Sequence, residues 1–242
     1  MARILLIEST TKACSVGIAN RGELIALREE VSGDYSHSSL LTVFVEEVLG
    51  EARMKTSDLD AVAVSQGPGS YTGLRIGVSV AKGICFGQDL PLLAIDTMKA
   101  LAATGIAHMT KIQGLIPPAS GKTLFCPMID ARRMEVYYAL FDRDLRPERE
   151  TRAEIMDEQS LREDALRNAR IFYFGDGAAK CRDVLMAPHL HFVDGVHPSV
   201  RGMAREAEKR FSEKQFEDLA YFEPFYLKNF VAGKPRVKGL YS

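Results

Sequence analysis

Apolar residues in the first hundred positions follow two different spacings, which predict strands and helices in turn. Short, nearly continuous apolar runs are typical of buried strands, and apolar residues at every third and fourth position are typical of amphipathic helices. The strands expected on this basis cover 3–7, 14–19, 23–30, 58–65 and 92–95. The helices expected between them cover 36–53, 72–87 and 96–107, with Thr72 as a cap of the second.

The same order begins again after a boundary. Residues 110–122 contain several Gly, Pro and Ser residues and predict a break between two units. Beyond it, an apolar run ends in Asp130 and a polar turn leads to a second strand, just as the first run ends in Glu8. This likeness predicts a structural duplication. Further helices are expected near 157–168, 178–186 and 199–214, and short strands near 171–174 and 190–193.

Composition limits the class of protein. The 242 residues carry 31 Lys and Arg against 32 Asp and Glu, so the net charge of −1 argues against a free-standing nucleic-acid binder. The length suits one large domain or two small lobes. No apolar run is long enough for a transmembrane helix. The four cysteines are far apart in the chain, which favours reduced thiols in a cytosolic protein over disulfides or a zinc site.

Two segments that follow predicted strands are candidates for phosphate contact. The first is the turn with Ser9, Thr10 and Lys12, and the second is the glycine-rich loop with Gly67, Gly69 and Ser70. Ligands collect at the carboxyl ends of strands, and helix N-termini bind anions. For the turn, the alternative is that its Ser and Thr side chains form hydrogen bonds with nearby backbone groups, and this alternative is favoured when the segment is considered alone. The alternative for the loop is close packing on another backbone, weighed equally with phosphate contact.

Two further groups of residues are weaker candidates. His189, His191 and His197 lie close together in the sequence, and solvated loop histidines are favoured there over a metal site. The stretch after Glu223 has no acidic residue, so it is a candidate for contact with RNA or an acidic partner. Its basic residues are Lys228, Lys234, Arg236 and Lys238. The aromatic residues of 222–230 predict that the first part of this stretch docks on the body.

Several of these segments together resemble the TsaB family, also called YeaZ. The most specific of them is the glycine-rich loop Gly67-Pro68-Gly69-Ser70-Tyr71-Thr72-Gly73-Leu74-Arg75-Ile76-Gly77. The supporting segments are 4–10, 14–16, 37–38, 81–83, 95–97, 130–137 and 223–227. The likeness therefore covers nearly the whole chain.

The resemblance implies an α/β fold of the actin-like ATPase (ASKHA) class. Such a fold has two related lobes, each with a mixed β-sheet flanked by helices. We therefore expect an N-terminal lobe over 1–103 and a second, reduced lobe over 104–216. A C-terminal segment over 217–242 is expected to pack back on the body and to end in a basic tail.

The resemblance also implies a function. It implies a non-catalytic, cytoplasmic scaffold that activates the TsaD transferase, together with the TsaE P-loop ATPase, in threonylcarbamoyl-adenosine modification of tRNA next to the anticodon. Such a chain forms a homodimer in isolation and reaches tRNA indirectly through the complex. It is expected to need no cofactor or metal of its own, with ATP or ADP at the partner interface. Glu8 stands where the family usually has Asp, and this longer side chain argues against ATP in the chain's own cleft.

The pairing surface implied by the resemblance lies on the helices after His37 and Thr72. Its expected residues are His37, Leu41, Val45, Val48, Tyr71, Thr72, Leu74, Arg75, Val78 and Ala81. The alternative is that these faces are buried in their own lobe. Two other functions stay open: an ATP-binding kinase or ATPase of the same class, and a metallopeptidase. The second is disfavoured because His37 is followed by Leu41, not by a ligand, at helical spacing.

Overall fold

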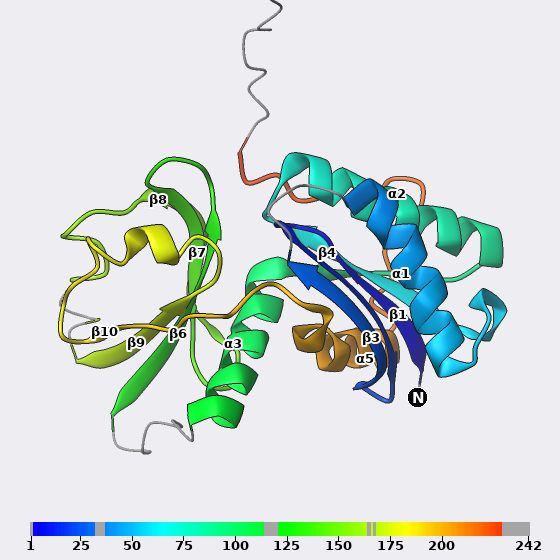
Figure 1. Ribbon diagram of the computed structural model, residues 1–242, viewed down its shortest axis with the longest axis horizontal. Coiled ribbons are helices and arrows are strands. Elements are labelled where there is room, and N and C mark those ends of the chain that lie inside the picture. Colours follow the sequence, from blue (N-terminus) through cyan, green and yellow to red (C-terminus); the bar gives the residue numbers. More distant parts are fainter. Residues whose placement is uncertain (1, 32–36, 114–120, 164–165, 167, 229–242) are drawn as a thin grey trace, which may run out of the picture.

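The computed structural model describes residues 2–31, 37–113, 121–163, 166 and 168–228, which form two lobes lying side by side (Figure 1). The strands are β1 (Arg3–Glu8), β2 (Ala13–Asn20), β3 (Glu23–Val31), β4 (Ala61–Gly67), β5 (Leu92–Asp96), β6 (Lys122–Asp130), β7 (Glu135–Phe141), β8 (Pro147–Ile155), β9 (Ala169–Phe174) and β10 (Leu190–Phe192). The helices are α1 (His37–Ala52), α2 (Tyr71–Gln88), α3 (Thr97–Gln113) and α5 (Ala204–Ser212), with short 3-10 turns η1 (Thr56–Asp58), η2 (Ala179–Cys181) and η3 (Val200–Gly202).

Each lobe is built on a five-stranded mixed sheet, and the two sheets have the same topology. The strand order is β3-β2-β1-β4-β5 in the first and β8-β7-β6-β9-β10 in the second. In both, the three strands of the meander are antiparallel, and the last two strands run parallel to the first. The predicted two-lobe α/β fold is confirmed, and the shared topology supports the predicted duplication.

The first sheet is covered by helices on both faces. Successive side chains of a strand point to opposite faces, so β1 contributes to two cores. Leu5 and Ile7 pack with α1 and α2 on one face, and Ile4 and Leu6 pack with η3 and α5 on the other. This two-sided burial explains why β1 is a continuous apolar run.

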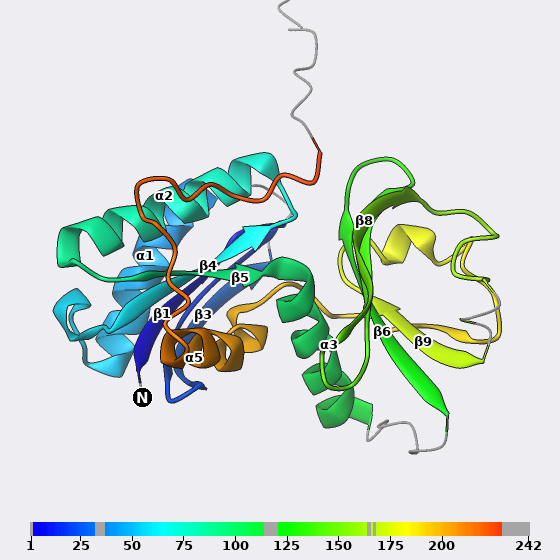
Figure 2. The same cartoon turned by 180° about the vertical axis from the view of Figure 1, so that it is seen from behind.

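Helix α3 lies between the two sheets and joins the lobes (Figure 2). Its Met98 and Leu101 belong to the core formed with the second sheet, whereas Ala100 belongs to the core of the first. Gly202 of η3 packs on the same helix so closely that a Cβ atom there would lie 1.9 Å from the Ala100 carbonyl oxygen. The lobes are therefore held together along α3.

Three details differ from the sequence prediction. Residues 199–212 pack on the first sheet, although they were expected within the second lobe, because Ala204 and Ala207 let α5 lie close to that sheet. The cap of α2 is Ser70, whose side chain accepts a hydrogen bond from the Gly73 N–H, so Thr72 lies inside the helix. Strand β8 was not predicted at all.

Two predicted helices of the second lobe are only partly comparable with the structure. Within 178–186 the structure has the single 3-10 turn η2 instead of a longer helix. The segment near 157–168 falls partly outside the described residues. None of the helices in the described part of the chain combines the length and apolarity that a membrane span requires.

Candidate functional site

A cavity of about 390 Å³ lies between the lobes, where the carboxyl ends of β1, β4 and β6 meet. This is the edge at which open α/β sheets collect ligands. The lining residues are Thr10, Thr11, Lys12, Pro68, Gly69, Ser70, Tyr71, Thr72, Ile129, Asp130, Ala131, Arg132, Tyr137, Asp176, Phe225, Tyr226, Leu227 and Lys228. Residues 10–12 and 68–72 come from the first lobe, residues 129–132, Tyr137 and Asp176 come from the second lobe, and residues 225–228 come from the C-terminal segment.

Glu8 at the end of β1 points into its own lobe. Its carboxylate accepts hydrogen bonds from the Thr10 N–H at 2.7 Å, from the Thr10 hydroxyl at 2.5 Å and from the Ser65 hydroxyl. The side chain is fully buried, and this burial raises the pKa of Glu8, against the opposing effect of its hydrogen bonds. The acid at the first turn is therefore a structural group that satisfies buried donors.

The glycine-rich loop packs directly on that turn. The Ser70 N–H donates to the Thr10 carbonyl at 2.6 Å, and the Ser9 hydroxyl donates to the Gly73 carbonyl at 2.8 Å. A Cβ atom would lie 2.5 Å from the Thr10 carbonyl oxygen at Gly69, and 2.0 Å from the Ser9 carbonyl oxygen at Gly73. The glycines are there for close packing, which was one of the two alternatives for this loop.

Some candidates for phosphate contact form hydrogen bonds inside the first lobe, and others line the cavity. Ser9 and Thr10 are buried and donate their hydroxyls to groups of the first lobe, and Thr10 also lines the cavity. Gly67 packs against the Phe225 carbonyl oxygen, 2.5 Å from where a Cβ atom would stand. Lys12 and Ser70 line the cavity, together with Gly69.

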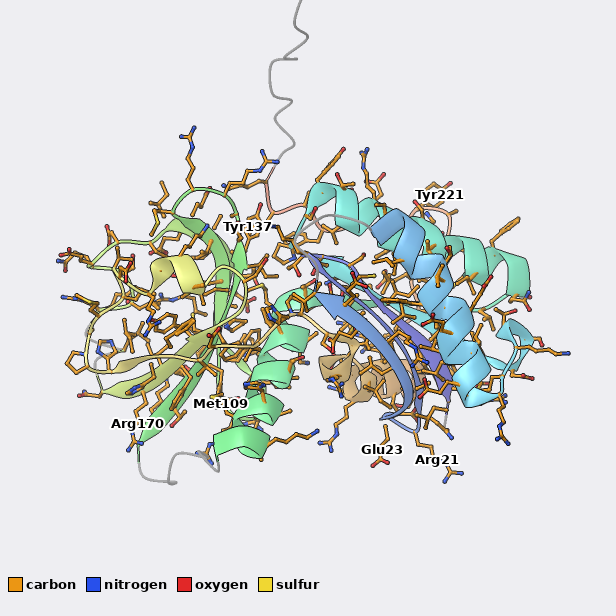
Figure 3. The ribbon with its side chains drawn as sticks, in the orientation of Figure 1. Arg21, Glu23, Met109, Tyr137, Arg170 and Tyr221 are labelled. Atoms are coloured by element: carbon orange, nitrogen blue, oxygen red, sulfur yellow. The ribbon has the colours of Figure 1, made fainter. Side chains whose placement is uncertain are left out.

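The second-lobe wall of the cavity carries charged groups. Asp130 pairs with Lys180 and accepts the Arg132 N–H at 2.9 Å. Asp176 accepts the Asp130 N–H at 3.3 Å, and burial raises the pKa of Asp176 to about 6. Tyr137 extends from β7 on the side that faces the first lobe (Figure 3). Sequence reasoning had singled out Asp130 only as the end of a strand, and it missed Asp176 and Lys180.

Residues 217–228, which we call the strap, run along the first lobe and reach the cavity at residues 225–228. The Phe225 N–H donates to the Gln66 carbonyl at 2.7 Å, and the ring of Tyr226 lies 5.0 Å from that of Tyr71. Arg75 lies over the Tyr71 ring at 4.1 Å and donates to the Tyr226 hydroxyl at 3.4 Å. The described part of the C-terminal segment therefore packs on the first lobe.

Most of the predicted pairing residues are buried in their own lobe, which corrects that prediction. At most 7% of each of six side chains is exposed, and all six lie in the first lobe. They are Leu41, Val45, Val48, Leu74, Val78 and Ala81. Both helices must cover the apolar face of the sheet, so their most apolar sides turn inward. Tyr71, Thr72 and Arg75 keep exposed surface, and the His37 side chain lies outside the described residues.

The remaining candidates do not come together as a site. The His189 ring nitrogen Nε2 lies 3.0 Å from the Leu161 carbonyl oxygen, and the His191 ring packs 5.2 Å from that of Phe172. Burial lowers the pKa of His191. Among the described residues, no group of three or more His, Cys, Asp or Glu side chains is placed to hold a metal ion. Lys228 pairs with Glu135, whereas Lys234, Arg236 and Lys238 lie outside the described residues.

Comparisons with known proteins agree with this geometry. The family model described as TsaD, tRNA N6-adenosine threonylcarbamoyltransferase, matches residues 33–229. The tRNA threonylcarbamoyladenosine biosynthesis protein TsaB of Escherichia coli is 31% identical over 237 residues, which are 96% of this chain and 97% of that protein. TsaB of Haemophilus influenzae is 27% identical over 239 residues, 96% and 95% of the two chains.

A solved structure is similar over almost the same length. YeaZ from Pseudomonas aeruginosa superposes with a TM-score of 0.76 at 25% sequence identity, covering 94% of this chain and all of that one. The fold, the glycine-rich loop packed on the first turn and the full-length similarity agree with one another. The chain belongs to the TsaB family, also called YeaZ, and it matches the related TsaD family model.

Proposed function

We propose that this chain is the non-catalytic subunit that activates a TsaD-like transferase in making threonylcarbamoyl-adenosine in tRNA. Its relatives are named for threonylcarbamoyladenosine biosynthesis, and the chain has a role in that process. One observation supports the non-catalytic part. The turn after β1, where a nucleotide-binding lobe would hold phosphate, uses the hydroxyls of Ser9 and Thr10 internally and is packed against Gly69 and Gly73.

The proposal places the partners as follows. The TsaD-like transferase binds the outer side of α1 and α2, and in isolation a second copy of the chain occupies the same surface. A TsaE-like P-loop ATPase joins the pair, and ATP or ADP sits at the partner interface. Because the net charge is only −1, tRNA is held mainly by the partner, in the cytoplasm where the complex works.

The outer side of α2 supports this arrangement. Thr72, Ser79 and Gly83 are exposed at helical spacing, and a Cβ atom at Gly83 would meet nothing within 4 Å. Small side chains along such a stripe allow another helix to approach closely, since the distance between packed helices depends on the residues in contact. The proposed surface therefore consists of the exposed residues of α2, which are the small ones together with Arg75 and the 83% exposed Phe86, and not of the buried apolar ones.

The test is a Ser→Arg substitution on each face of the first lobe. Ser79→Arg places a long charged side chain on the outer side of α2, and we expect stimulation of a TsaD-like transferase to fall about tenfold or more. Ser212→Arg is the matched control, because Ser212 is exposed at the end of α5 on the opposite face of the sheet. Val78→Arg is unsuitable, since Val78 is buried and its replacement would unfold the lobe.

Two results would contradict the proposal. Equal stimulation by both variants would show that the pairing surface does not lie on α2. Micromolar binding of ATP to the isolated chain in calorimetry, with turnover, would favour the alternative of an ATP-binding kinase or ATPase of the same fold. Stimulation by the two variants is measured as the threonylcarbamoyl-adenosine content of tRNA in a reconstituted reaction, with and without this chain.

A further inference from the structure

The strap leaves α5 and crosses the first lobe before it reaches the cavity (Figure 2). The Glu217 N–H donates to the Leu92 carbonyl at 2.9 Å, at the end of the first sheet. Lys82 on α2 then donates to the carbonyls of Ala220 and Phe222, at 3.3 and 3.2 Å. The strap is thus attached to both the sheet and a helix of the first lobe.

Its hold on the first lobe continues up to the mouth of the cavity. Leu219 and Phe222 pack against the core under α1 and α2. The Phe225 N–H donates to the Gln66 carbonyl, and Tyr226 contacts the ring of Tyr71. Backbone hydrogen bonds and packed aromatic rings both hold this part of the strap, so its separation from the first lobe would break many contacts at once.

Lys228 makes the polar link from the strap to the second lobe. Its ammonium group pairs with the Glu135 carboxylate and lies 5.9 Å from the centre of the Tyr137 ring. The two side chains of the ion pair are 40% and 25% exposed. Partly exposed ion pairs contribute little and are screened by salt, so this end of the strap is held far more weakly than the rest.

The weak contact lies on the side of the molecule away from the joint between the lobes. Helix α3 joins the sheets at one side of the cavity, and the strap crosses at the other (Figure 1). A rotation of the lobes about α3 therefore opens the structure most at Lys228. We propose that Lys228 is a latch, which closes the cavity by holding Glu135 and Tyr137 and releases it while the rest of the strap stays on the first lobe.

The test measures the separation of the lobes with a pair of spin labels. All four native cysteines, Cys14, Cys85, Cys126 and Cys181, are buried, so exposed cysteines can be labelled selectively. Cysteines at Ser212 at the end of α5 and Asp183 after η2 place one label on each lobe, and both positions are exposed and away from the proposed pairing surface. Distance distributions from pulsed electron resonance are then recorded for the full chain.

Three variants separate a latch from an ordinary surface pair. In Lys228→Glu, repulsion from Glu135 should shift the distribution to longer distances. Lys228→Arg should leave it unchanged, and Lys228→Glu combined with Glu135→Lys should restore it. In the unsubstituted chain, about 1 M salt should produce the same shift, because the screening length falls to about 3 Å.

Two outcomes would overturn the latch. One is an unchanged distance distribution in Lys228→Glu and at high salt. The other is a shift that the exchanged pair does not reverse. Urea unfolding of each labelled variant confirms that the lobes are folded, so a shift reports movement of the lobes and not loss of structure.

Discussion

The two lobes have the same sheet topology but end their first strands differently. In the first lobe, Glu8 is fully buried and its carboxylate is surrounded by the hydroxyls of Thr10 and Ser65. In the second lobe, Asp130 is about half exposed and pairs with Lys180 beside the cavity. Glu8 therefore stabilises the packed interior of its lobe, whereas Asp130 places a charged group beside the cavity.

The comparison shows that a shared fold does not give both lobes the same role. Both lobes bring glycines against the end of their first strand: Gly73 lies on Ser9, and Gly177 lies on Ile129 and Asp130. The difference lies in the side chains around the acid. The first lobe supplies hydroxyl donors that bury the acid, whereas the second supplies the Lys180 ammonium group and the Arg132 N–H to an acid that stays at the surface. The first turn is a packed junction, and the second keeps its polar groups toward the cavity.

The largest expected effect is on the glycine junction of the first lobe. In Gly73→Ala the new Cβ atom would lie 2.0 Å from the Ser9 carbonyl oxygen, so the turn and α2 would be forced apart. We expect the free energy of unfolding to fall by about 3 kcal/mol or more. Gly83→Ala on the same helix is the control, and it should raise this free energy by about 0.5–1 kcal/mol because the position is open. Urea unfolding of both variants checks the prediction, and equal effects would contradict it.

The next effect compares the two acids by the same substitution. Glu8→Ala leaves the Thr10 and Ser65 donors buried without their acceptor, and it should lower the free energy of unfolding by about 2–3 kcal/mol. Asp130→Ala removes a partly exposed pair and one turn hydrogen bond, so it should cost about 1 kcal/mol or less. Denaturant titrations of both variants give the two values. A larger loss for Asp130→Ala than for Glu8→Ala would contradict the assignment of Glu8 as the structural acid and Asp130 as the surface acid.

The sequence was sufficient for most of the first lobe. Strands β1 to β5 and helices α1 to α3 follow from apolar spacing, because each packs an apolar face against one core. It was also sufficient to predict the duplication, from the acids Glu8 and Asp130 that end two similar runs. Such patterns are local, so they can be recognised in a segment without knowing which part of the protein packs against it.

The features that were missed depend on partners far away in the chain. Strand β8 is an edge strand whose residues are mostly charged or half buried, so it has no apolar alternation to recognise. The helical spacing of Leu41 and Val78 identified an apolar face but not whether a sheet or another protein covers it. Likewise, the pairing of Lys228 with Glu135 joins positions 93 residues apart, and no local pattern predicts it.

The smallest expected effect tests whether the charged form of the buried Asp176 carboxyl group lowers the free energy of unfolding. Burial raises the pKa of Asp176 from 3.8 to about 6, so the folded protein binds this proton more tightly than the unfolded chain does. The stabilisation is complete below about pH 3.8 and is lost as the pH rises through about 6. Asp176→Asn keeps an acceptor for the Asp130 N–H but carries no charge. Its gain in free energy of unfolding should be near zero at pH 4 and on the order of 1–2 kcal/mol at pH 7.

Asp157 offers a control of opposite sign in the same lobe. Hydrogen bonds from Gln159 and Ser160 lower the pKa of Asp157, so its stabilisation is present above the ordinary value of 3.8 and is lost as the pH falls. Asp157→Asn should therefore be less stable than the unsubstituted chain at pH 7, with the difference closing under acid. Urea unfolding of the three proteins between pH 3 and 7 measures both trends. If Asp176→Asn followed the trend of Asp157→Asn, the second-lobe acid would be stabilised by its surroundings and the contrast with the packed first lobe would be lost.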